Sequence, residues 1–367
     1  MRSFFAAPIA VDLSITGRCN LNCSYCYASA GLGATDLPFS IISRLFDEAS
    51  FLGIHFIRLA GGEPFLHKSI NSILRTAAAH DFHTSVSSNG IVISDDQLQS
   101  LRDFRIGLVL SIDSHIAQIH EANRGSFAAT MRTLERALQL GVAVSTATVL
   151  TSQNAGHIES LLEHLKSQGV HRSAILLLCP VGRGAKFKQL ATKAQLSAAI
   201  HGANRFRMKY PEYQLSLVAP HESEVPWEHV APVALAHPSD LGIVGRTTHG
   251  PRKLGCYAGI STCAICADGR VFGCEQMSGF SELEAGNILH QTLAVIWRHS
   301  GVLSRLREIE IEGLQGNCAT CVLEGCGGGC RAAAYSQSHS LSASDPRCAE
   351  WSNEIRAAAQ ELYRIHN

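Results

Sequence analysis

Short apolar runs alternate with stretches of helical periodicity along the first 210 residues. The apolar runs predict buried strands at 9–16, 54–60, 83–88, 106–112, 142–150 and 173–179. Apolar positions spaced three and four apart predict helices near 40–52, 69–80, 94–103, 126–140, 154–168 and 193–209. Strands that alternate with covering helices are typical of a parallel sheet. The pattern therefore predicts an α/β fold, a partial (β/α)6 TIM-like barrel.

The pattern changes after residue 210. Residues 211–255 are rich in proline and have little periodicity, so we expect a bridging segment. The chain then becomes rich in cysteine and glycine, and "CADGRVFGC" (266–274) predicts a β-hairpin. The expected parts are a barrel at 1–210, a bridge at 211–255, a small cysteine-rich domain at 256–350 and a C-terminal helix at 351–367.

Composition excludes several classes of protein. Charged residues make up 17% of the 367 positions and the net charge is zero, which gives no indication of nucleic acid or an anionic membrane as a partner. No apolar run is long enough to span a bilayer. The apolar start meets Asp12 too early for a signal peptide, so we expect a cytoplasmic protein.

Cysteine is the unusual component. Twelve of the thirteen cysteines fall into two groups near the two ends of the chain, and Cys179 stands alone. An odd number of thiols in a reducing compartment favours metal or cluster ligation over disulfide bonds.

The first group is the segment "CNLNCSYC", which we call the cysteine loop (19–26). Three thiolates hold three irons of a cubane cluster and leave the fourth open for chemistry. A zinc site with a fourth ligand from elsewhere, or buried structural thiols, are the alternatives. The loop follows the first predicted strand, and "GGEP", "SSNG" and "SIDS" follow later strands. Because barrel chemistry lies at the carboxyl ends of strands, we expect one shared site.

The cysteine loop carries Tyr25 just before its last cysteine, and the second predicted strand ends in "GGEP" (61–64). Over roughly the first 210 residues this combination resembles the radical S-adenosylmethionine (radical SAM) superfamily. The resemblance implies that Cys19, Cys23 and Cys26 bind a 4Fe–4S cluster whose open iron is chelated by SAM. It also implies that one electron splits SAM into methionine and a 5′-deoxyadenosyl radical, which abstracts a substrate hydrogen.

The "GGEP" motif suits the methionyl end of such a cofactor. Gly61 and Gly62 allow backbone to approach the ammonium group closely. Glu63 is expected to accept a charge-assisted hydrogen bond from it, and Pro64 fixes the turn. The resemblance also makes four polar residues candidates for the ribose or carboxylate of SAM: Ser87, Asn89, Ser111 and Arg124. Arg124 is preferred because guanidinium clamps carboxylate bidentately. The alternatives are that "SSNG" is only a turn and Arg124 a surface charge.

The second group of cysteines closely resembles the SPASM extension of radical SAM enzymes over roughly 256–350, with one residue fewer between two of its cysteines. The resemblance implies two auxiliary 4Fe–4S clusters. One would be held by Cys318, Cys321, Cys326 and Cys348, and the other in part by Cys256, Cys274 and Cys330. For the fourth ligand of the latter we favour Cys263, with Cys266 or an open iron as alternatives. A pair of zinc knuckles is the alternative for the whole region.

Two further residues are catalytic candidates. Glu275 directly follows Cys274, where some SPASM enzymes place a general base. The alternative is an exposed hairpin charge. Cys179 ends the sixth predicted strand and is a candidate hydrogen-atom donor, with a core thiol as the alternative.

These inferences predict a radical SAM/SPASM enzyme with three 4Fe–4S clusters that modifies a ribosomally made peptide or protein during natural-product maturation. Because the cysteine loop begins at residue 19, we expect a separate small protein to recognise a peptide leader. An external donor such as flavodoxin or ferredoxin would supply electrons. The first alternative substrate is a tetrapyrrole, as in the haem pathway, or another small molecule. The second alternative is a non-catalytic iron–sulfur or zinc protein.

Overall fold

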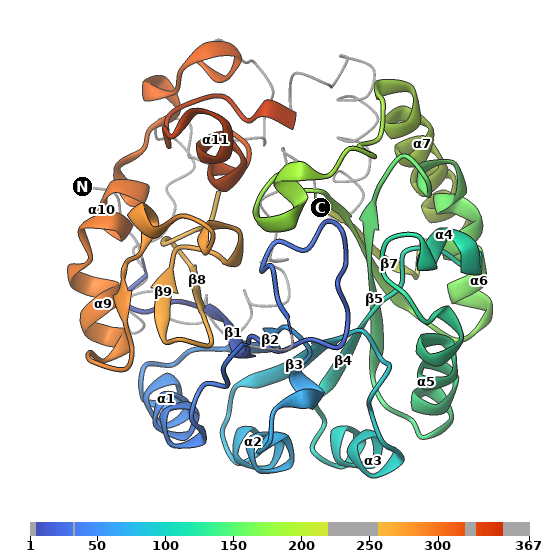
Figure 1. The fold of residues 1–367 in the computed structure, drawn as a ribbon, viewed down its shortest axis with the longest axis horizontal. Helices are drawn as coiled ribbons and strands as arrows, with labels where there is room; N and C mark the ends of the chain where they lie inside the picture. The colour runs from blue at the N-terminus through green and yellow to red at the C-terminus, as the bar shows by residue number, and fades with distance from the viewer. Residues whose placement is uncertain (1–4, 32–33, 219–255, 320–327, 348–367) are drawn as a thin grey trace.

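The computed structural model describes residues 5–31, 34–218, 256–319 and 328–347. Its strands form a single sheet in the order β10-β9-β8-β1-β2-β3-β4-β5-β6-β7 (Figure 1). The strands are β1 (Ala10–Thr16), β2 (Phe56–Gly61), β3 (His83–Ser88), β4 (Gly107–Ser111), β5 (Val144–Leu150), β6 (Arg172–Leu177), β7 (Gln214–Val218), β8 (Thr262–Ile265), β9 (Arg270–Phe272) and β10 (Gly286–Asn287).

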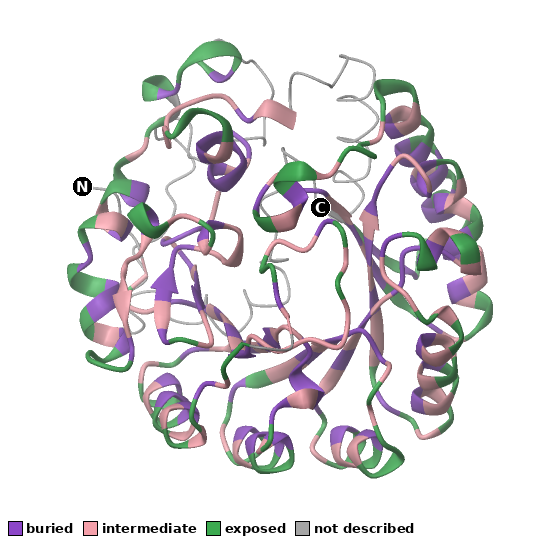
Figure 2. Ribbon diagram, viewed as in Figure 1, coloured by how far each residue is buried: buried purple, intermediate pink, exposed green. Residues whose placement is uncertain are grey.

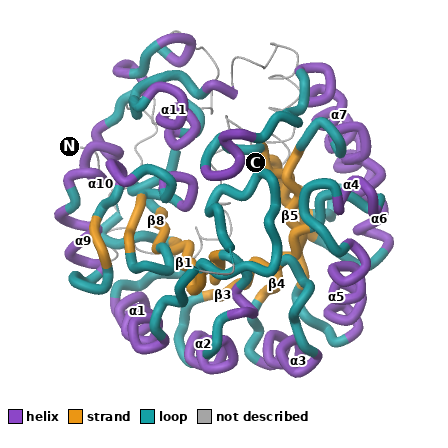
Figure 3. Tube along the Cα trace, viewed as in Figure 1, coloured by secondary structure: helices purple, strands orange, loops and turns teal. Residues whose placement is uncertain are grey.

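The helices of the barrel lie outside the curved sheet (Figure 3). They are α1 (Phe39–Phe51), α2 (Ile70–Ala77), α3 (Asp95–Asp103), α4 (Ala117–Glu121), α5 (Phe127–Gln139), α6 (Ile158–Ser167) and α7 (Lys193–Lys209). The cysteine-rich domain adds α9 (Leu293–His299), α10 (Gly301–Glu308) and α11 (Arg331–Ser338). None of the helices in the described ranges combines the length and the apolar character needed to cross a membrane.

Strand alternation separates the core from the barrel interior. On β1, Val11, Leu13 and Ile15 are almost fully buried, whereas Asp12 and Ser14 between them are only partly buried. Because successive side chains of a strand point to opposite faces, the apolar set packs against the helices and the polar set faces inward. Figure 2 shows the matching buried stripe on the inner side of each outer helix. The predicted partial barrel is confirmed, with every neighbouring pair from β1 to β7 parallel.

The cysteine-rich domain continues the sheet of the barrel. Strand β8 pairs in parallel with β1, with Val11 opposite Cys263 and Leu13 opposite Ile265. The predicted hairpin is present, because β9 runs antiparallel to β8. Residues that follow β9 therefore lie beside the barrel strands, and Glu275 contacts Arg58 in the middle of β2.

The structure also differs from the expectation at 211–255. Residues Gln214–Val218 form β7, which pairs in parallel with β6 and extends the barrel sheet beyond residue 210. The strand is only five residues long and lies beside proline-rich sequence, so its pattern was too short to stand out. The predicted helix at 351–367 lies outside the described residues.

Candidate active site

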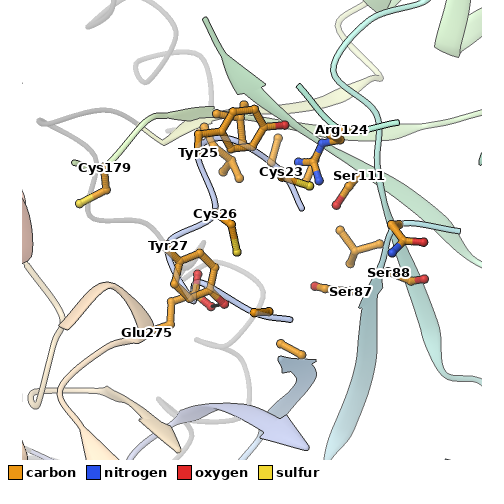
Figure 4. A pocket seen from close by; sticks show the side chains of 18 of the residues that line it. Cys23, Tyr25, Cys26, Tyr27, Ser87, Ser88, Ser111, Arg124, Cys179 and Glu275 are labelled. Atoms are coloured by element: carbon orange, nitrogen blue, oxygen red, sulfur yellow. Dashed lines mark hydrogen bonds between the residues drawn. The ribbon is translucent and has the colours of Figure 1, made fainter. Parts of the chain in front are cut away.

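A cavity of about 410 Å³ lies inside the barrel and extends from the carboxyl ends of the parallel strands to Arg172 at the amino end of β6 (Figure 4). It is lined by eleven of the residues singled out from the sequence: Cys19, Cys23, Cys26, Gly61, Gly62, Ser87, Asn89, Ser111, Arg124, Cys179 and Glu275. Glu63 and Pro64 are not part of this lining. Small side chains on the inner face of the sheet, among them Ala60, Ser145 and Ala174, leave the interior open.

Arg183 holds the cysteine loop in place from the segment that follows β6. Its Nε donates to the carbonyl oxygen of Cys23 at 2.8 Å, and its Nη1 donates to that of Ala30 at 2.9 Å. The backbone N–H of Arg183 donates to the carbonyl oxygen of Cys26 at 2.9 Å. These bonds satisfy loop carbonyls that have no partner in a helix or strand, so they fix where the three thiols lie.

The glycines of "GGEP" pack directly against the end of β1. Gly61 has a φ of +130°, and a Cβ there would lie 2.1 Å from the carbonyl oxygen of Thr16. A Cβ on Gly62 would lie 2.0 Å from the carbonyl oxygen of Arg18, and the Gly62 N–H donates to Thr16 at 2.7 Å. Only glycine permits this approach of two backbones. The contact of both glycines with a cofactor stays a prediction.

Glu63 lies fully buried behind the cavity wall. Its carboxylate accepts hydrogen bonds from the Ser88 hydroxyl at 2.8 Å, from the Asn89 N–H at 2.8 Å and from the Phe65 N–H at 3.2 Å. Burial raises the pKa of Glu63 to about 7. Asn89 in turn donates to Asn20 of the cysteine loop at 2.8 Å. In this structure Glu63 therefore ties "SSNG" to "GGEP", and its contact with a cofactor ammonium stays a prediction.

Arg124 lines the cavity, and its positive charge is paired with the carboxylate of Asp113. Its Nε donates to Asp113 at 2.9 Å, and its guanidinium lies 5.3 Å from the centre of the Tyr25 ring. The Tyr25 hydroxyl donates to the same carboxylate. Burial acts to lower the pKa of Arg124, but Asp113, Tyr25 and Cys23 together raise it above its ordinary value. Among the described residues its Nη groups have no hydrogen-bond partner, which leaves them free for an anion.

The supporting role of Asp113 was missed in the sequence. This residue follows β4 in "SIDS", and its other oxygen accepts from the Val149 N–H at 2.9 Å. An acidic residue placed directly after a buried strand is a signal that could have identified it.

Glu275 belongs to a partly buried charge network that joins the two domains. Its Oε2 accepts from Arg58 at 2.8 Å and from the Tyr27 hydroxyl at 2.9 Å. Arg58 also pairs with Asp12 at 2.7 Å. Burial raises the pKa of Asp12 to about 6 although Arg58 acts to lower it. Glu275 therefore faces the cavity rather than bulk solvent, and its role as a general base stays a prediction.

The second group of cysteines is partly described. Cys256, Cys274 and Cys330 lie close enough to affect one another, because the pKa of Cys274 is raised by burial and then by the other two. Cys179 lies close enough to Cys330 for the two thiols to shift each other's pKa, that of Cys179 upward and that of Cys330 downward. Cys318 is buried in the same region, and its thiol lies 3.8 Å from the Gly328 carbonyl oxygen. The remaining predicted ligands, Cys321, Cys326 and Cys348, lie outside the described residues.

The structure does not bring Cys263 or Cys266 to those thiols. Cys263 is fully buried, and the charged groups that affect its pKa are Asp12 and Arg307. Burial raises the pKa of Cys266 to about 11, with Asp268 as the nearest charge that adds to this. The preference for Cys263 as a cluster ligand therefore has no support in this geometry.

The thiols of the cysteine loop fit a cluster. No three His, Cys, Asp or Glu side chains among the described residues converge on one point, as a single metal ion requires. A cubane instead binds its thiolates at separate irons. Cys19, Cys23 and Cys26 line one wall of the cavity on a loop whose backbone is pinned, so three soft donors face an enclosed space.

Comparisons with known proteins agree with this geometry. Residues 13–165 match a family model described as the radical SAM superfamily, and residues 256–322 match SPASM, an iron–sulfur cluster-binding domain. An AdoMet-dependent heme synthase of Oleidesulfovibrio alaskensis is 27% identical over 342 residues, which cover 91% of this chain and 85% of that relative. The mycofactocin maturase MftC of Mycobacterium ulcerans is 26% identical over 354 residues, covering 94% and 88%.

A solved structure supports the fold. The crystal structure of SuiB from Streptococcus suis bound to the precursor peptide SuiA matches with a TM-score of 0.75 at 16% identity. The match covers 93% of this chain and 76% of SuiB. The fold of nearly the whole chain is thus already seen in a solved structure.

Gly182 provides a test of how the cysteine loop is held. It has a φ of +57°, and a Cβ there would lie 2.1 Å from the carbonyl oxygen of Tyr27. We expect Gly182→Ala to push the loop away and to weaken SAM binding by about 100-fold, the scale of a 1 Å misplacement. The measurement is SAM titration followed by the EPR spectrum of the reduced cluster.

Gly53→Ala is the matched control for that substitution. Gly53 has a similar φ of +69° and no atom within 4 Å of an added Cβ, so it adds backbone strain without a collision. It is expected to keep SAM affinity close to that of the wild type. If both substitutions weakened SAM binding equally, backbone strain and not contact with the cysteine loop would be the cause.

The raised pKa of Glu63 predicts a pH-dependent stability. The value of about 7 lies above the ordinary 4.5, so the folded chain binds this proton more tightly than the unfolded chain. The resulting stabilisation is fully present below about pH 4.5 and is lost as the pH rises through 7. Relative to Glu63→Gln, we expect the wild-type free energy of unfolding to fall by on the order of 3 kcal/mol across this window.

Urea unfolding at a series of pH values measures this difference. Glu135→Gln, at an exposed position of α5, is the control and should follow the wild type at every pH. If the free energies of unfolding of Glu63→Gln and of the wild type changed equally with pH, the expected titration of Glu63 would be contradicted.

Proposed function

We propose that this chain, which belongs to the radical SAM superfamily and carries a SPASM domain, modifies a ribosomally synthesised peptide or protein. The chain is an enzyme that binds SAM and iron–sulfur clusters. The observation that supports the proposal best is the enclosed cavity in which the three thiols of the cysteine loop, Arg124 and Glu275 of the SPASM domain meet.

The residues of the cavity have distinct tasks in this proposal. Cys19, Cys23 and Cys26 would hold a 4Fe–4S cluster, which when bound supplies the electron that cleaves SAM. Arg183 keeps the loop that carries these thiols in position. The Nη groups of Arg124 are directed to bind the SAM carboxylate, while Asp113 orients the guanidinium.

We assign the chain three clusters. The cysteine loop would hold one, Cys256, Cys274 and Cys330 would hold much of the second, and Cys318 would contribute to the third together with cysteines outside the described residues. An external one-electron donor, such as flavodoxin or ferredoxin, would reduce the first cluster. Clusters held by these cysteines would offer an oxidised product a path for the electron that it releases.

A peptide substrate is favoured by the charges of the cavity. Arg58 is paired with two carboxylates and Arg124 with one, and Arg183 donates to carbonyl oxygens. Among the described lining residues, Arg183 and Arg172 are the cations whose partners are neutral; Arg183 holds the cysteine loop, and Arg172 lies at the opposite end of β6. Such a cavity offers little to a polyanion. MftC is a maturase by its name, and SuiB was solved with a precursor peptide. We further propose that a separate small protein recognises the peptide leader.

A tetrapyrrole is the second candidate substrate. It is favoured by the similarity to AdoMet-dependent heme synthases, at 27% identity over most of both chains. Tetrapyrroles of the haem pathway carry several carboxylates, which need unpaired cations near the site. Arg58 and Arg124 are already paired with carboxylates, and Arg183 is bound to loop carbonyl oxygens, which supports the peptide over this candidate.

The first prediction of this proposal concerns the cysteine loop. Replacing Cys19, Cys23 and Cys26 together by Ala is expected to abolish 5′-deoxyadenosine formation from SAM under reductant, because no cluster then contacts the cofactor. Iron bound by the SPASM domain should remain. Chromatography of the products and iron analysis of anaerobically purified protein measure both effects. Residual cleavage of SAM would contradict the assignment of this site.

The second prediction separates the two substrates. Reduced enzyme and SAM are incubated either with a precursor peptide encoded beside its gene or with an iron tetrapyrrole that carries propionate groups. We expect a mass change in the peptide and none in the tetrapyrrole. The Cys19, Cys23 and Cys26 triple variant is the control for both reactions. Conversion of the tetrapyrrole with an unmodified peptide would overturn the peptide proposal.

A further inference from the structure

Cys179 lies where the barrel meets the SPASM domain. It follows β6 by two residues and is only 9% exposed. Its thiol is close enough to Cys330 and Cys274 for both to raise its pKa. In Figure 4 its sulfur points away from the thiol of Cys26, toward the SPASM side of the cavity. Cys179 thus joins the second group of cysteines in space although it is far from them in the sequence.

Cys330 is held firmly at this place. It is the N-cap residue of α11, and its sulfur accepts from the Ala333 N–H at 3.4 Å. Its own N–H donates to Asp345 at 2.8 Å, and Asp345 pairs with Arg347. Helix N-termini and nearby cations favour the thiolate form of cysteine, which is the form that binds iron. Cys179 therefore lies beside a proposed cluster ligand, Cys330, whose position is fixed by these hydrogen bonds.

Four thiols come together here from four separate parts of the chain. Cys179 follows β6, Cys256 precedes β8, Cys274 follows β9 and Cys330 caps α11. Cys256, Cys274 and Cys330 influence one another electrostatically, and Cys179 contacts Cys330 and lies near Cys274. A cubane with all irons held by protein needs four thiolates.

The two rival cysteines on β8 and beside it lie elsewhere. Cys263 is opposite Val11 in the parallel pairing, so both side chains are on the face of the sheet that packs against the helices. That face is the opposite one from the barrel cavity. The pKa of Cys266 is affected by burial and then by Asp268, Arg270, Ser278 and Glu275. Neither has another cysteine among the groups that influence it.

We propose that Cys179 of the barrel supplies the fourth thiolate of the auxiliary cluster that Cys256, Cys274 and Cys330 hold. This inference rests on the proposed assignment of a cluster to those three cysteines. It replaces both roles considered from the sequence, because a cluster ligand is neither a hydrogen-atom donor nor a plain core thiol. It also removes Cys263 as the expected fourth ligand.

Two properties follow from a fourth protein thiolate. Every iron of the cluster is coordinated, so a substrate does not bind to it directly and the cluster can only exchange electrons. The cluster also links the carboxyl end of β6 to the SPASM domain. Because Cys179 lines the cavity, the cluster would lie at its wall.

The test uses full-length protein in which Cys19, Cys23 and Cys26 are replaced by Ala, so that only auxiliary clusters contribute to the spectra. In this parent we compare Cys179→Ala, Cys179→Ser and Cys263→Ala by iron and sulfide content and by EPR of the reduced protein. Potassium cyanide is then added as a probe for an open iron.

We expect Cys179→Ala either to lose about four irons per chain or to keep them with a new EPR signal that cyanide shifts. Cys179→Ser, with an oxygen donor, should keep the fold and shift the auxiliary signal. Cys263→Ala should match the parent in iron content, EPR signal and insensitivity to cyanide. If Cys179→Ala does not fold, the EPR signal of Cys179→Ser decides whether Cys179 is a cluster ligand.

Unchanged spectra and iron content in the Cys179 variants would overturn the inference, as would loss of the signal in Cys263→Ala alone. Either outcome leaves the proposed function intact. A parent without any auxiliary cluster would instead contradict the proposed cluster assignment, and the inference with it.

Discussion

The site depends on a set of hydrogen bonds that hold a loop without regular structure. The cysteine loop presents carbonyl oxygens that no helix or strand satisfies, and buried carbonyls need partners. Arg183 supplies them from one side, and the tightly packed end of β2 supports the start of the loop from the other. Because a residue larger than glycine would collide at Gly62, the position of the three thiols is set by backbone contacts.

Compensated charge is the second requirement of the cavity. Arg58 lies between Asp12 and Glu275, and Arg124 lies beside Asp113. A buried ion without a partner is strongly destabilising, so each of these side chains restricts where its partners can lie. The Arg58 pair crosses from the barrel to the SPASM domain, and so the wall of the cavity is formed by both.

The sequence predicted regular elements well where periodicity is long. The helix at 193–209 and the strand at 83–88 have the predicted bounds. The gathering of eleven candidates around one cavity was predictable, since parallel strands end at a common edge. The pairing of Arg58 with Glu275 and the contact of Cys179 with Cys330 were not. Both join residues far apart in the chain, and no local pattern records which distant side chains meet.

The parallel pairing of β1 with β8 has a consequence for how the protein is made. Strand β1 leaves the ribosome early, yet one of its two neighbours is contributed by residues 262–265. Joining such distant segments carries a large loop-closure cost and makes folding slow. During synthesis, the outer edge of β1 therefore stays unpaired and open to aggregation until most of the chain has emerged. Loading of iron at the cysteine loop that follows β1 is best suited to the finished polypeptide.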